Sequence, residues 1–308
     1  MAGQGRLSGD DNSIATATEA DYQRPSVSIA LASHPVAQYY ERKTDSILRR
    51  YGPGPRVHFH TGFLDEPATK TTAPLLRAEI RESQERMLRD SADAWDLRNI
   101  AFRQVLDVGC GLGGAAIFWA EEFGSDVTAI TIAPSHVPLI ASFAAEAGVS
   151  SQVHPLLCDA LEVPGDDRFD AVLSLDSSCY LNRPAWFLRV AELLRRGGRL
   201  FIADCFVEQE AYRAAFDRYW CARIGAVEEY LAAAQAAGLR LERRDDVSVL
   251  VANFWGTTMA LIRLEAQATN ASQAENLKWR ESLRVHSLMR EGLLDGGLRH
   301  LMMSFTKP

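Results

Sequence analysis

A glycine-rich segment at residues 107–114, with the sequence DVGCGLGG, constrains the fold more than any other part of this chain of 308 residues. It overlaps the end of a short apolar run at 103–109 and leads into a helical pattern at 113–123. Glycines at such a junction allow left-handed backbone conformations and let a ligand approach the backbone closely. The segment therefore predicts a buried parallel strand, a ligand-binding turn and a helix, in that order.

Strand and helix patterns alternate along most of the chain. The runs that predict strands lie at 103–109, 126–132, 153–160, 169–176, 199–206, 239–248 and 298–308. Helical patterns lie at 33–52, 72–95, 113–123, 134–148, 184–196, 207–222, 225–238 and 251–294. Alternation of this kind is typical of βαβ units around a parallel sheet. We therefore expect an α/β fold with a seven-stranded, mostly parallel sheet.

The same patterns divide the chain into four parts. They are an N-terminal tail and helical lid at 1–95, a core at 96–250, a helical cap insertion at 251–296, and a final strand of the core sheet at 297–308. The first part contains no strand run, so we expect it to cover the core as a lid rather than to fold independently.

Charge and composition limit the partners and the location that we expect. Lys and Arg number 33 against 40 Asp and Glu, a net charge of −7, which argues against binding to nucleic acid. No apolar run approaches the roughly 18 to 20 residues of a membrane span, and the N-terminus lacks the apolar core of a signal peptide. The five cysteines form no CxxC pair and predict no metal site. We expect a cytoplasmic protein with no membrane span.

Two kinds of ligand fit the glycine-rich turn. Gly109, Gly111 and Gly114 satisfy the dinucleotide pattern GxGxxG, but that pattern also calls for an acidic residue at the end of the second strand. Thr131 stands there instead, followed by Ile132. An acid before the first glycine, as in Asp107, suits a ligand with an amino group, such as the methionine part of S-adenosylmethionine (SAM).

The segments DVGCGLGG, AITIAPSHV, CDALEVP, FDAVLSLDSSCY and ELLRRGGRLFIADC occur in this order between residues 100 and 206. Together they resemble the motif set of class I SAM-dependent methyltransferases. The resemblance implies a Rossmann-like core with SAM as cofactor. A dehydrogenase and a SAM-binding protein without catalytic activity are the alternatives.

The resemblance also assigns roles in cofactor binding. The residues that it places around SAM are Asp107, Gly109, Gly111, Gly113, Thr131, Ile132, His136, Asp159, Ala160 and Tyr40. Asp107 would lie near the amino group, and Asp159 near the adenine. Two of these residues have simpler interpretations: Asp159 as a loop acid that caps a helix, and His136 as a residue on a helix surface.

The segment after the fourth strand narrows the class of acceptor. Amino methyltransferases of nucleic acids typically carry (N/D)PPY there, whereas this chain has DSSCY at 176–180. That element, with YYERKTD at 39–45, VHFHTGF at 57–63 and an aromatic cap, resembles geranyl diphosphate C-methyltransferase and the related terpenoid, teleocidin-type C-methyltransferases. The resemblance implies methyl transfer to an alkene carbon of a prenyl chain, carried by a free diphosphate or a prenylated indole alkaloid, with cyclisation as an option.

This second resemblance implies a set of catalytic and acceptor-binding residues. The catalytic candidates are Asp176, Tyr180 and His60, and the acceptor-binding candidates are Tyr22, His58, Tyr219, Trp220, Phe254 and Trp255. The diphosphate enzymes carry Glu where this chain has Asp176, a departure that leaves the final deprotonation step open. The alternative for Asp176 is a helix N-cap, and for each aromatic residue a place in the core.

A different class of acceptor stays in play. An O- or N-methyltransferase of a small natural product would need a general base near the methyl group, and His58, His60 or His154 could supply it. We expect a hydrophobic small-molecule acceptor and a homo-oligomer, and we leave a role for Mg²⁺ open.

Overall fold

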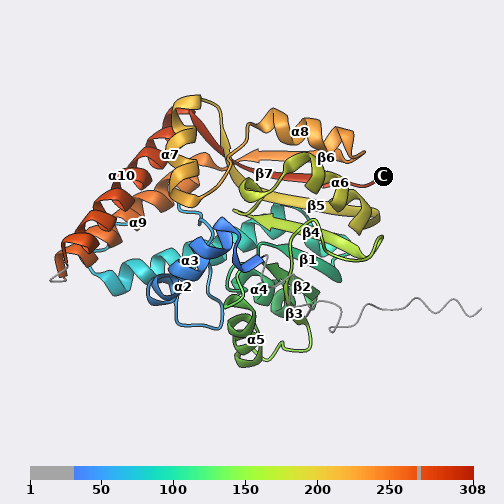
Figure 1. Ribbon diagram of the computed structural model, residues 1–308, viewed down its shortest axis with the longest axis horizontal. Coiled ribbons are helices and arrows are strands. Elements are labelled where there is room, and N and C mark those ends of the chain that lie inside the picture. Colours follow the sequence, from blue (N-terminus) through green and yellow to red (C-terminus); the bar gives the residue numbers. More distant parts are fainter. Residues whose placement is uncertain (1–30, 269–271) are drawn as a thin grey trace, which may run out of the picture.

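The computed structural model describes residues 31–268 and 272–308. Its seven strands form one sheet in the order β3-β2-β1-β4-β5-β7-β6, which Figure 1 shows from β6 at the top to β3 at the bottom. The strands are β1 (Gln104–Val108), β2 (Asp126–Thr131), β3 (Val153–Leu157), β4 (Phe169–Leu175), β5 (Leu194–Val207), β6 (Arg240–Asp246) and β7 (Leu298–Thr306). All neighbouring pairs from β3 to β5 are parallel, and β7 is antiparallel to both β5 and β6. The predicted α/β fold with a mostly parallel seven-stranded sheet is confirmed.

The helices lie where the sequence predicts them. They are α2 (Pro35–Tyr51), α3 (Ala73–Ala94), α4 (Gly114–Phe123), α5 (His136–Glu146), α6 (Arg183–Leu193), α7 (Glu210–Trp220), α8 (Val227–Ala236), α9 (Ser248–Ala268) and α10 (Gln273–Asp295). Single 3-10 turns, η2 (Leu97–Asn99) and η3 (Ser178–Tyr180), precede β1 and follow β4.

Two strands differ from the expectation. β5 begins at Leu194, before the two glycines that we expected to precede it, and its register with β4 shifts between Phe169 and Ala171. This irregularity accommodates Gly197 in a left-handed conformation, with a φ of 78°. The C-terminal strand β7 lies inside the sheet, between β5 and β6, so the polar strand β6 forms the edge. An exposed, charged edge strand resists pairing with other chains.

Side chains at alternate strand positions pack into two separate hydrophobic cores, one on each face of the sheet. Val105 on β1 points to the face covered by α3, α4 and α5, whereas its neighbour Leu106 points to the face covered by α6 and α8. This is the two-residue period of a strand that is buried on both faces. The arrangement brings the carboxyl ends of β1, β4 and β5 to one edge, and the strand order reverses between β1 and β4. Ligands of open α/β sheets bind at such a point.

Lid and cap helices gather over that edge. α3 packs on α9 through a small cluster of Leu76, Ile80, Phe254 and Leu261, and Figure 1 shows α9 and α10 side by side at one end of the molecule. Among the described residues before β1 there is no strand. Within residues 31–268 and 272–308, no helix is long and apolar enough to cross a membrane.

Candidate active site

A cleft opens where β1, β2 and β3 end. Its lining contains most of the residues that the sequence assigns to the cofactor: Tyr40, Gly109, Gly111, Thr131, Ile132, His136, Asp159 and Ala160. Asp107 lines a smaller hollow that continues from this cleft, together with His58, His60 and Asp176. Gly113 lines neither space. It starts α4, and a side chain there would collide with Ile140 at 2.7 Å.

The turn after β1 takes its shape from glycines in the left-handed region. Gly109 and Gly111 have φ angles of 70° and 56°, which side chains other than glycine rarely adopt. A Cβ at Gly109 would lie 2.7 Å from Ser177, so a side chain is also excluded by the protein itself. A Cβ at Gly111 would meet no atom within 4 Å. Gly111 therefore faces open space in the cleft.

Asp107 supplies a buried charge with an unused acceptor. Its side chain is 2% exposed, and Oδ2 has no hydrogen-bond partner among the described residues. Burial raises the pKa of Asp107 to about 7. A buried carboxylate is costly without a compensating donor, so this site favours a ligand that brings a cationic or N–H group. The ammonium group of SAM fits this requirement.

His136 joins the glycine turn to the lid. Its Nδ1 lies 2.9 Å from the carbonyl oxygen of Gly111, and its Nε2 lies 3.0 Å from Oγ1 of Thr44 on α2. The residue is 1% exposed, so the interpretation of His136 as a helix-surface residue is wrong. Its ring is held at both nitrogens, and it fixes α2 against the turn.

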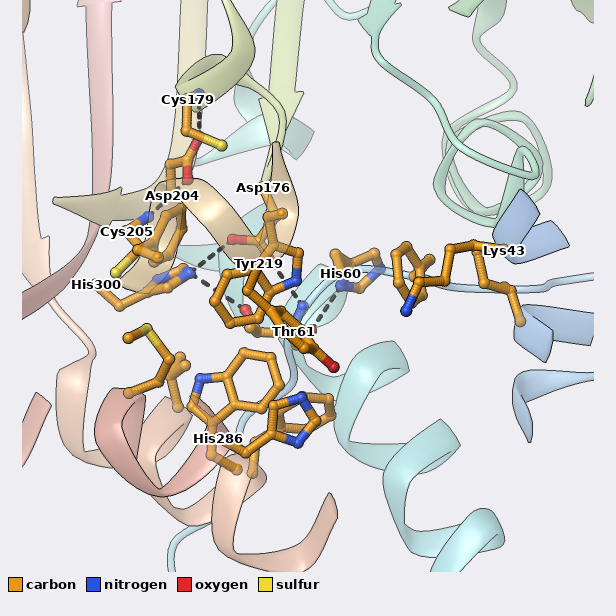
Figure 2. Close-up of a pocket in the computed structure, with 18 of the residues that line it drawn as sticks. Lys43, His60, Thr61, Asp176, Cys179, Asp204, Cys205, Tyr219, His286 and His300 are labelled. Carbon is orange, nitrogen blue, oxygen red and sulfur yellow. Dashed lines mark hydrogen bonds and ion pairs between the residues drawn. The ribbon is translucent and has the colours of Figure 1, made fainter. Parts of the chain in front are cut away.

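A second and deeper cavity, of about 120 Å³, lies between the lid, the cap and the ends of β4, β5 and β7. Figure 2 shows ten of its residues with labels: Lys43, His60, Thr61, Asp176, Cys179, Asp204, Cys205, Tyr219, His286 and His300. The predicted residues Tyr40, Tyr180, Trp220, Phe254 and Trp255 line it as well. Tyr40 and Tyr180 line both this cavity and the cofactor cleft, and their hydroxyls are 3.1 Å apart. The two tyrosines therefore stand at the boundary of the two spaces.

One wall of the deep cavity is aromatic. Trp255 lies 5.8 Å from Trp220 and 4.7 Å from His286 between ring centroids, and Tyr219 lies 4.7 Å from Trp220. Burial lowers the pKa of His286 to about 3, so this imidazole is neutral at pH 7. The wall thus presents electron-rich faces, and its imidazole is neutral.

Asp176 is fixed at the floor of the cavity by two donors. Its Oδ2 accepts a hydrogen bond of 2.6 Å from the backbone N–H of Thr61, and its Oδ1 pairs with Nε2 of His300 at 2.9 Å. Asp176 has a φ of 48°, and the N-cap of the following η3 turn is Ser177, so Asp176 is not a helix N-cap. Burial alone raises the pKa of Asp176, but its bonds to His300 and Thr61 hold that pKa below the ordinary value.

A second carboxylate lies at the same level on the next strand. Asp204 on β5 accepts bonds from Ser178 Oγ and from the backbone N–H groups of Cys179 and Cys205. Burial raises the pKa of Asp204 to about 6, with the charge of Asp176 adding to the effect. Because three donors from the turn after β4 and from β5 converge on it, Asp204 holds the η3 turn that carries Tyr180.

His58 and His60 point into a buried chain of contacts. His58 Nε2 bonds Oε1 of Glu85 at 2.8 Å, and His58 Nδ1 lies 3.2 Å from His60 Nε2. His60 Nδ1 donates to the carbonyl oxygen of Thr61 at 2.6 Å, so its Nε2 is the unprotonated nitrogen and faces Nδ1 of His58. Burial, with the neighbouring His58, lowers the pKa of His60 to about 4. Both nitrogens of His60 are engaged, so His60 has no free position for a proton from an acceptor.

Five residues that line the cavity are not predicted from the sequence. They are Thr61, Asp204, His286, His300 and Lys43. Of the predicted residues, His58 lines the hollow beside Asp107 rather than the deep cavity, and Tyr22 lies outside the described residues. The one sequence signal for His300 is that it is a polar residue inside an apolar strand. This signal points to the site only once β7 is known to lie beside β5.

Comparisons with known proteins address the same residues. The family described as a methyltransferase domain matches residues 105–198, which contain the glycine turn and the ends of β2, β3 and β4. Residues 105–198 thus form a methyltransferase domain, and the chain has the Rossmann-like class I fold of SAM-dependent methyltransferases. A probable chloroplastic tocopherol O-methyltransferase of Oryza sativa subsp. japonica is 27% identical over 268 residues, which cover 82% of this chain and 73% of that protein.

Solved methyltransferases share the fold. A structure of geranyl diphosphate methyltransferase with GPP and sinefungin has a TM-score of 0.74 and 18% identity, over 89% of this chain and 98% of that one. Geranyl diphosphate C-methyltransferase from Streptomyces coelicolor A3(2), in complex with Mg²⁺, geranyl diphosphate and S-adenosyl-L-homocysteine, has a TM-score of 0.72 and 17% identity, over 90% and 99% of the two chains.

The methyltransferase should bind SAM in a pH-dependent way through Asp107. Because burial raises the pKa of Asp107 to about 7 in the free protein, the carboxylate that pairs with the ammonium of SAM forms only as the pH rises through this value. The dissociation constant measured by calorimetry should fall between pH 6 and pH 8. Asp107→Asn should weaken binding by roughly 10-fold or more, the scale of a lost charged hydrogen bond. It should also remove that part of the pH dependence, and an Asn variant with wild-type affinity would contradict the assignment.

Proposed function

We propose that this methyltransferase transfers the methyl group of SAM to an alkene carbon of a prenyl or terpenoid acceptor. The observation that carries the proposal is the deep cavity, whose lining combines an aromatic wall with two fixed carboxylates and two neutral imidazoles. An alkene that gains a methyl group leaves a positive charge on the neighbouring carbon. Aromatic faces and a carboxylate both stabilise such a charge where water is excluded.

The charges of the cavity also orient an acceptor. Lys43 lies at one end, with Nζ 5.4 Å from the ring centroid of Tyr39 and 5.5 Å from that of Tyr219. Figure 2 shows Lys43 on the opposite side of the drawn residues from His300 and Asp204. A prenyl chain with its polar head towards Lys43 would place its apolar part against the wall of Trp220 and Trp255. Geranyl diphosphate, which is bound in the solved structure of the Streptomyces coelicolor C-methyltransferase, has this character.

The residues have distinct tasks in the proposed reaction. SAM supplies an electrophilic methyl group on sulfur and leaves as S-adenosylhomocysteine. Tyr40 and Tyr180, at the boundary of the two spaces, position the acceptor carbon in line with that methyl group. The alkene electron pair forms the new C–C bond, and the charge that develops on the adjacent carbon faces Asp176 and the aromatic wall. Loss of a proton, whose C–H electron pair forms a new double bond, or attack by an aromatic ring of the acceptor ends the reaction.

O-methylation of a small natural product is the second candidate, since the tocopherol relative is an O-methyltransferase by name. That chemistry needs a base beside the methyl group. His60 has both nitrogens engaged, and the pKa of Asp176 is held low, so neither is poised to take a proton from a hydroxyl. His154 is on β3 and pairs with Asp126, outside the lining of both spaces.

Isotopically labelled SAM decides between the two candidates. The protein is incubated with methyl-¹³C SAM and with geranyl diphosphate, prenylated indoles or simple phenols, each with and without Mg²⁺. We expect a ¹³C methyl signal of a carbon-bound methyl group from a prenylated acceptor. A signal of a methyl group on oxygen or nitrogen would contradict C-methylation.

The aromatic wall gives a further test. Trp255→Leu should lower kcat with a prenyl acceptor by roughly 30-fold, because a cation–π contact in a desolvated site contributes about 2 kcal/mol. Trp255→Phe keeps an aromatic face at the same position and should retain most of the turnover. Equal losses in the two variants would show that the ring acts through its volume alone.

A further inference from the structure

His300 and Thr61 enclose Asp176 from two sides. His300 lies on β7 opposite Cys205 of β5, and it is 1% exposed. Its Nε2 lies 2.9 Å from Asp176 Oδ1 and 3.2 Å from Thr61 Oγ1. The backbone N–H of Thr61 donates to the other carboxylate oxygen at 2.6 Å. Two residues far apart in the sequence thus contact both oxygens of one carboxylate.

The donors in this cluster are consistent with one proton arrangement. An ionised carboxylate only accepts hydrogen bonds, so His300 Nε2 must carry the proton that faces Asp176. The hydroxyl of Thr61 lies 3.8 Å from the sulfur of Met87, to which it donates, and its oxygen can accept from the same His300 N–H. Each Asp176 oxygen then has one donor and keeps a further lone pair. The Asp176 side chain is 19% exposed, whereas the His300 side chain is 1% exposed. The carboxylate lone pairs that have no donor therefore belong to the side chain that reaches the cavity.

We propose that His300 is a positioning residue for methyl transfer, which together with Thr61 fixes Asp176 as an oriented carboxylate at the floor of the acceptor cavity. His300 acts through Asp176, in the way that buried hydrogen-bond partners orient the groups that contact a substrate. The inference rests on the proposed function in that Asp176 must face the developing positive charge. It makes Asp176 a persistent counter-charge rather than the final proton acceptor, because a carboxylate paired in this way is a weak base.

Other titratable groups surround Asp176 and must be considered with His300. From β5, η3, the 52–72 loop and α2 they are Asp204, Cys205, Cys179, Tyr180, His60 and Tyr40. Burial raises the pKa values of Cys179, Cys205, Tyr40 and Tyr180, so these four are neutral at pH 7. His60 is neutral as well, and Asp204 is a like charge that opposes ionisation of Asp176. His300 is therefore the nearest group that can favour the ionised form through a side-chain contact.

The first measurement needs no acceptor. In protein labelled with ¹³Cγ-aspartate, with Asp176→Asn to assign the signal, Asp176 should show no titration between pH 8 and pH 4. In His300→Leu the midpoint should rise by about one pH unit or more, because a donor to the ionised carboxylate is lost. His300→Gln keeps a donor near the position of Nε2, and it should shift the midpoint less. His154→Leu, which removes an exposed histidine paired with Asp126 on the same sheet, is the matched control and should leave Asp176 unchanged.

The second measurement is turnover with the acceptor found in the labelled-SAM assay. His300→Leu should lower kcat by roughly 10- to 100-fold, with SAM affinity and the KM for the acceptor changed less than about 2-fold. His300→Gln should fall between wild type and Leu. An Asp176 signal that titrates as in wild type, or a wild-type kcat in His300→Leu, would overturn the proposal. Loss of cooperative unfolding in both variants would overturn it too, since His300 would then be a core residue. If none of the tested acceptors is methylated, the proposed function fails while the titration still decides the role of His300.

Discussion

Gly111→Val should abolish SAM binding while the protein stays folded. A Cβ at Gly111 meets no protein atom within 4 Å, so a valine there enters the open space of the cofactor cleft. The left-handed φ of 56° adds a backbone cost of about 1–2 kcal/mol for any side chain. We expect the dissociation constant of SAM in calorimetry to rise by at least about 100-fold, because one buried clash commonly costs about 3 kcal/mol.

The backbone cost of that substitution can be measured separately. Gly124, which ends α4, has a φ of 64° and open space around its Cβ position, but it lines neither the cleft nor the deep cavity. Gly124→Val should therefore lower thermal stability by an amount similar to that for Gly111→Val and leave SAM affinity unchanged. Wild-type SAM affinity in Gly111→Val would mean that the cofactor does not contact this turn.

The lining of the cofactor cleft and of the hollow beside it is predictable because its residues are local in sequence. Asp107, Gly109 and Gly111 lie within five positions at the end of one strand, and the glycines predict a turn that a ligand can approach. The resemblance to the methyltransferase motif set adds Thr131, the last residue of β2, and Asp159, which follows β3. Each lies at the carboxyl end of a parallel strand, and the fold brings all such ends to one edge.

The acceptor cavity depends on contacts between residues that are far apart in the sequence. His300 reaches Asp176 only because β7 enters the sheet between β5 and β6, and an order of strands cannot be deduced from their apolar patterns. The contacts of His60 also depend on distant residues: its spacing from His58 predicts that both lie on one side of the chain, but not that Glu85 of α3 bonds His58. Long-range partners decide which of several polar residues is free to react.

Asp176→Asn should lower turnover by roughly 100-fold or more while SAM affinity stays at the wild-type value. The substitution removes the negative charge that faces the cavity. It also turns an amide N–H₂ towards either His300 Nε2 or the Thr61 N–H, both of which are donors, so the new side chain cannot satisfy both contacts. Asp176→Glu keeps the charge and should retain more activity than Asn, measured as kcat with the acceptor identified by ¹³C labelling.

A control carboxylate on the same strand separates charge from stability. Asp170, near the opposite end of β4, accepts bonds of 3.1 and 2.8 Å from the backbone N–H groups of Arg103 and Gln104 and pairs with Arg195 at 2.7 Å. Asp170→Asn should therefore destabilise the protein about as much as Asp176→Asn, by an estimated 1–3 kcal/mol, without lowering kcat at a temperature where both are folded. Equal kcat values for the two variants would refute a catalytic role for Asp176. Retained methyl transfer with altered product ratios in Asp176→Asn would instead show that the carboxylate directs the fate of the cation rather than its formation.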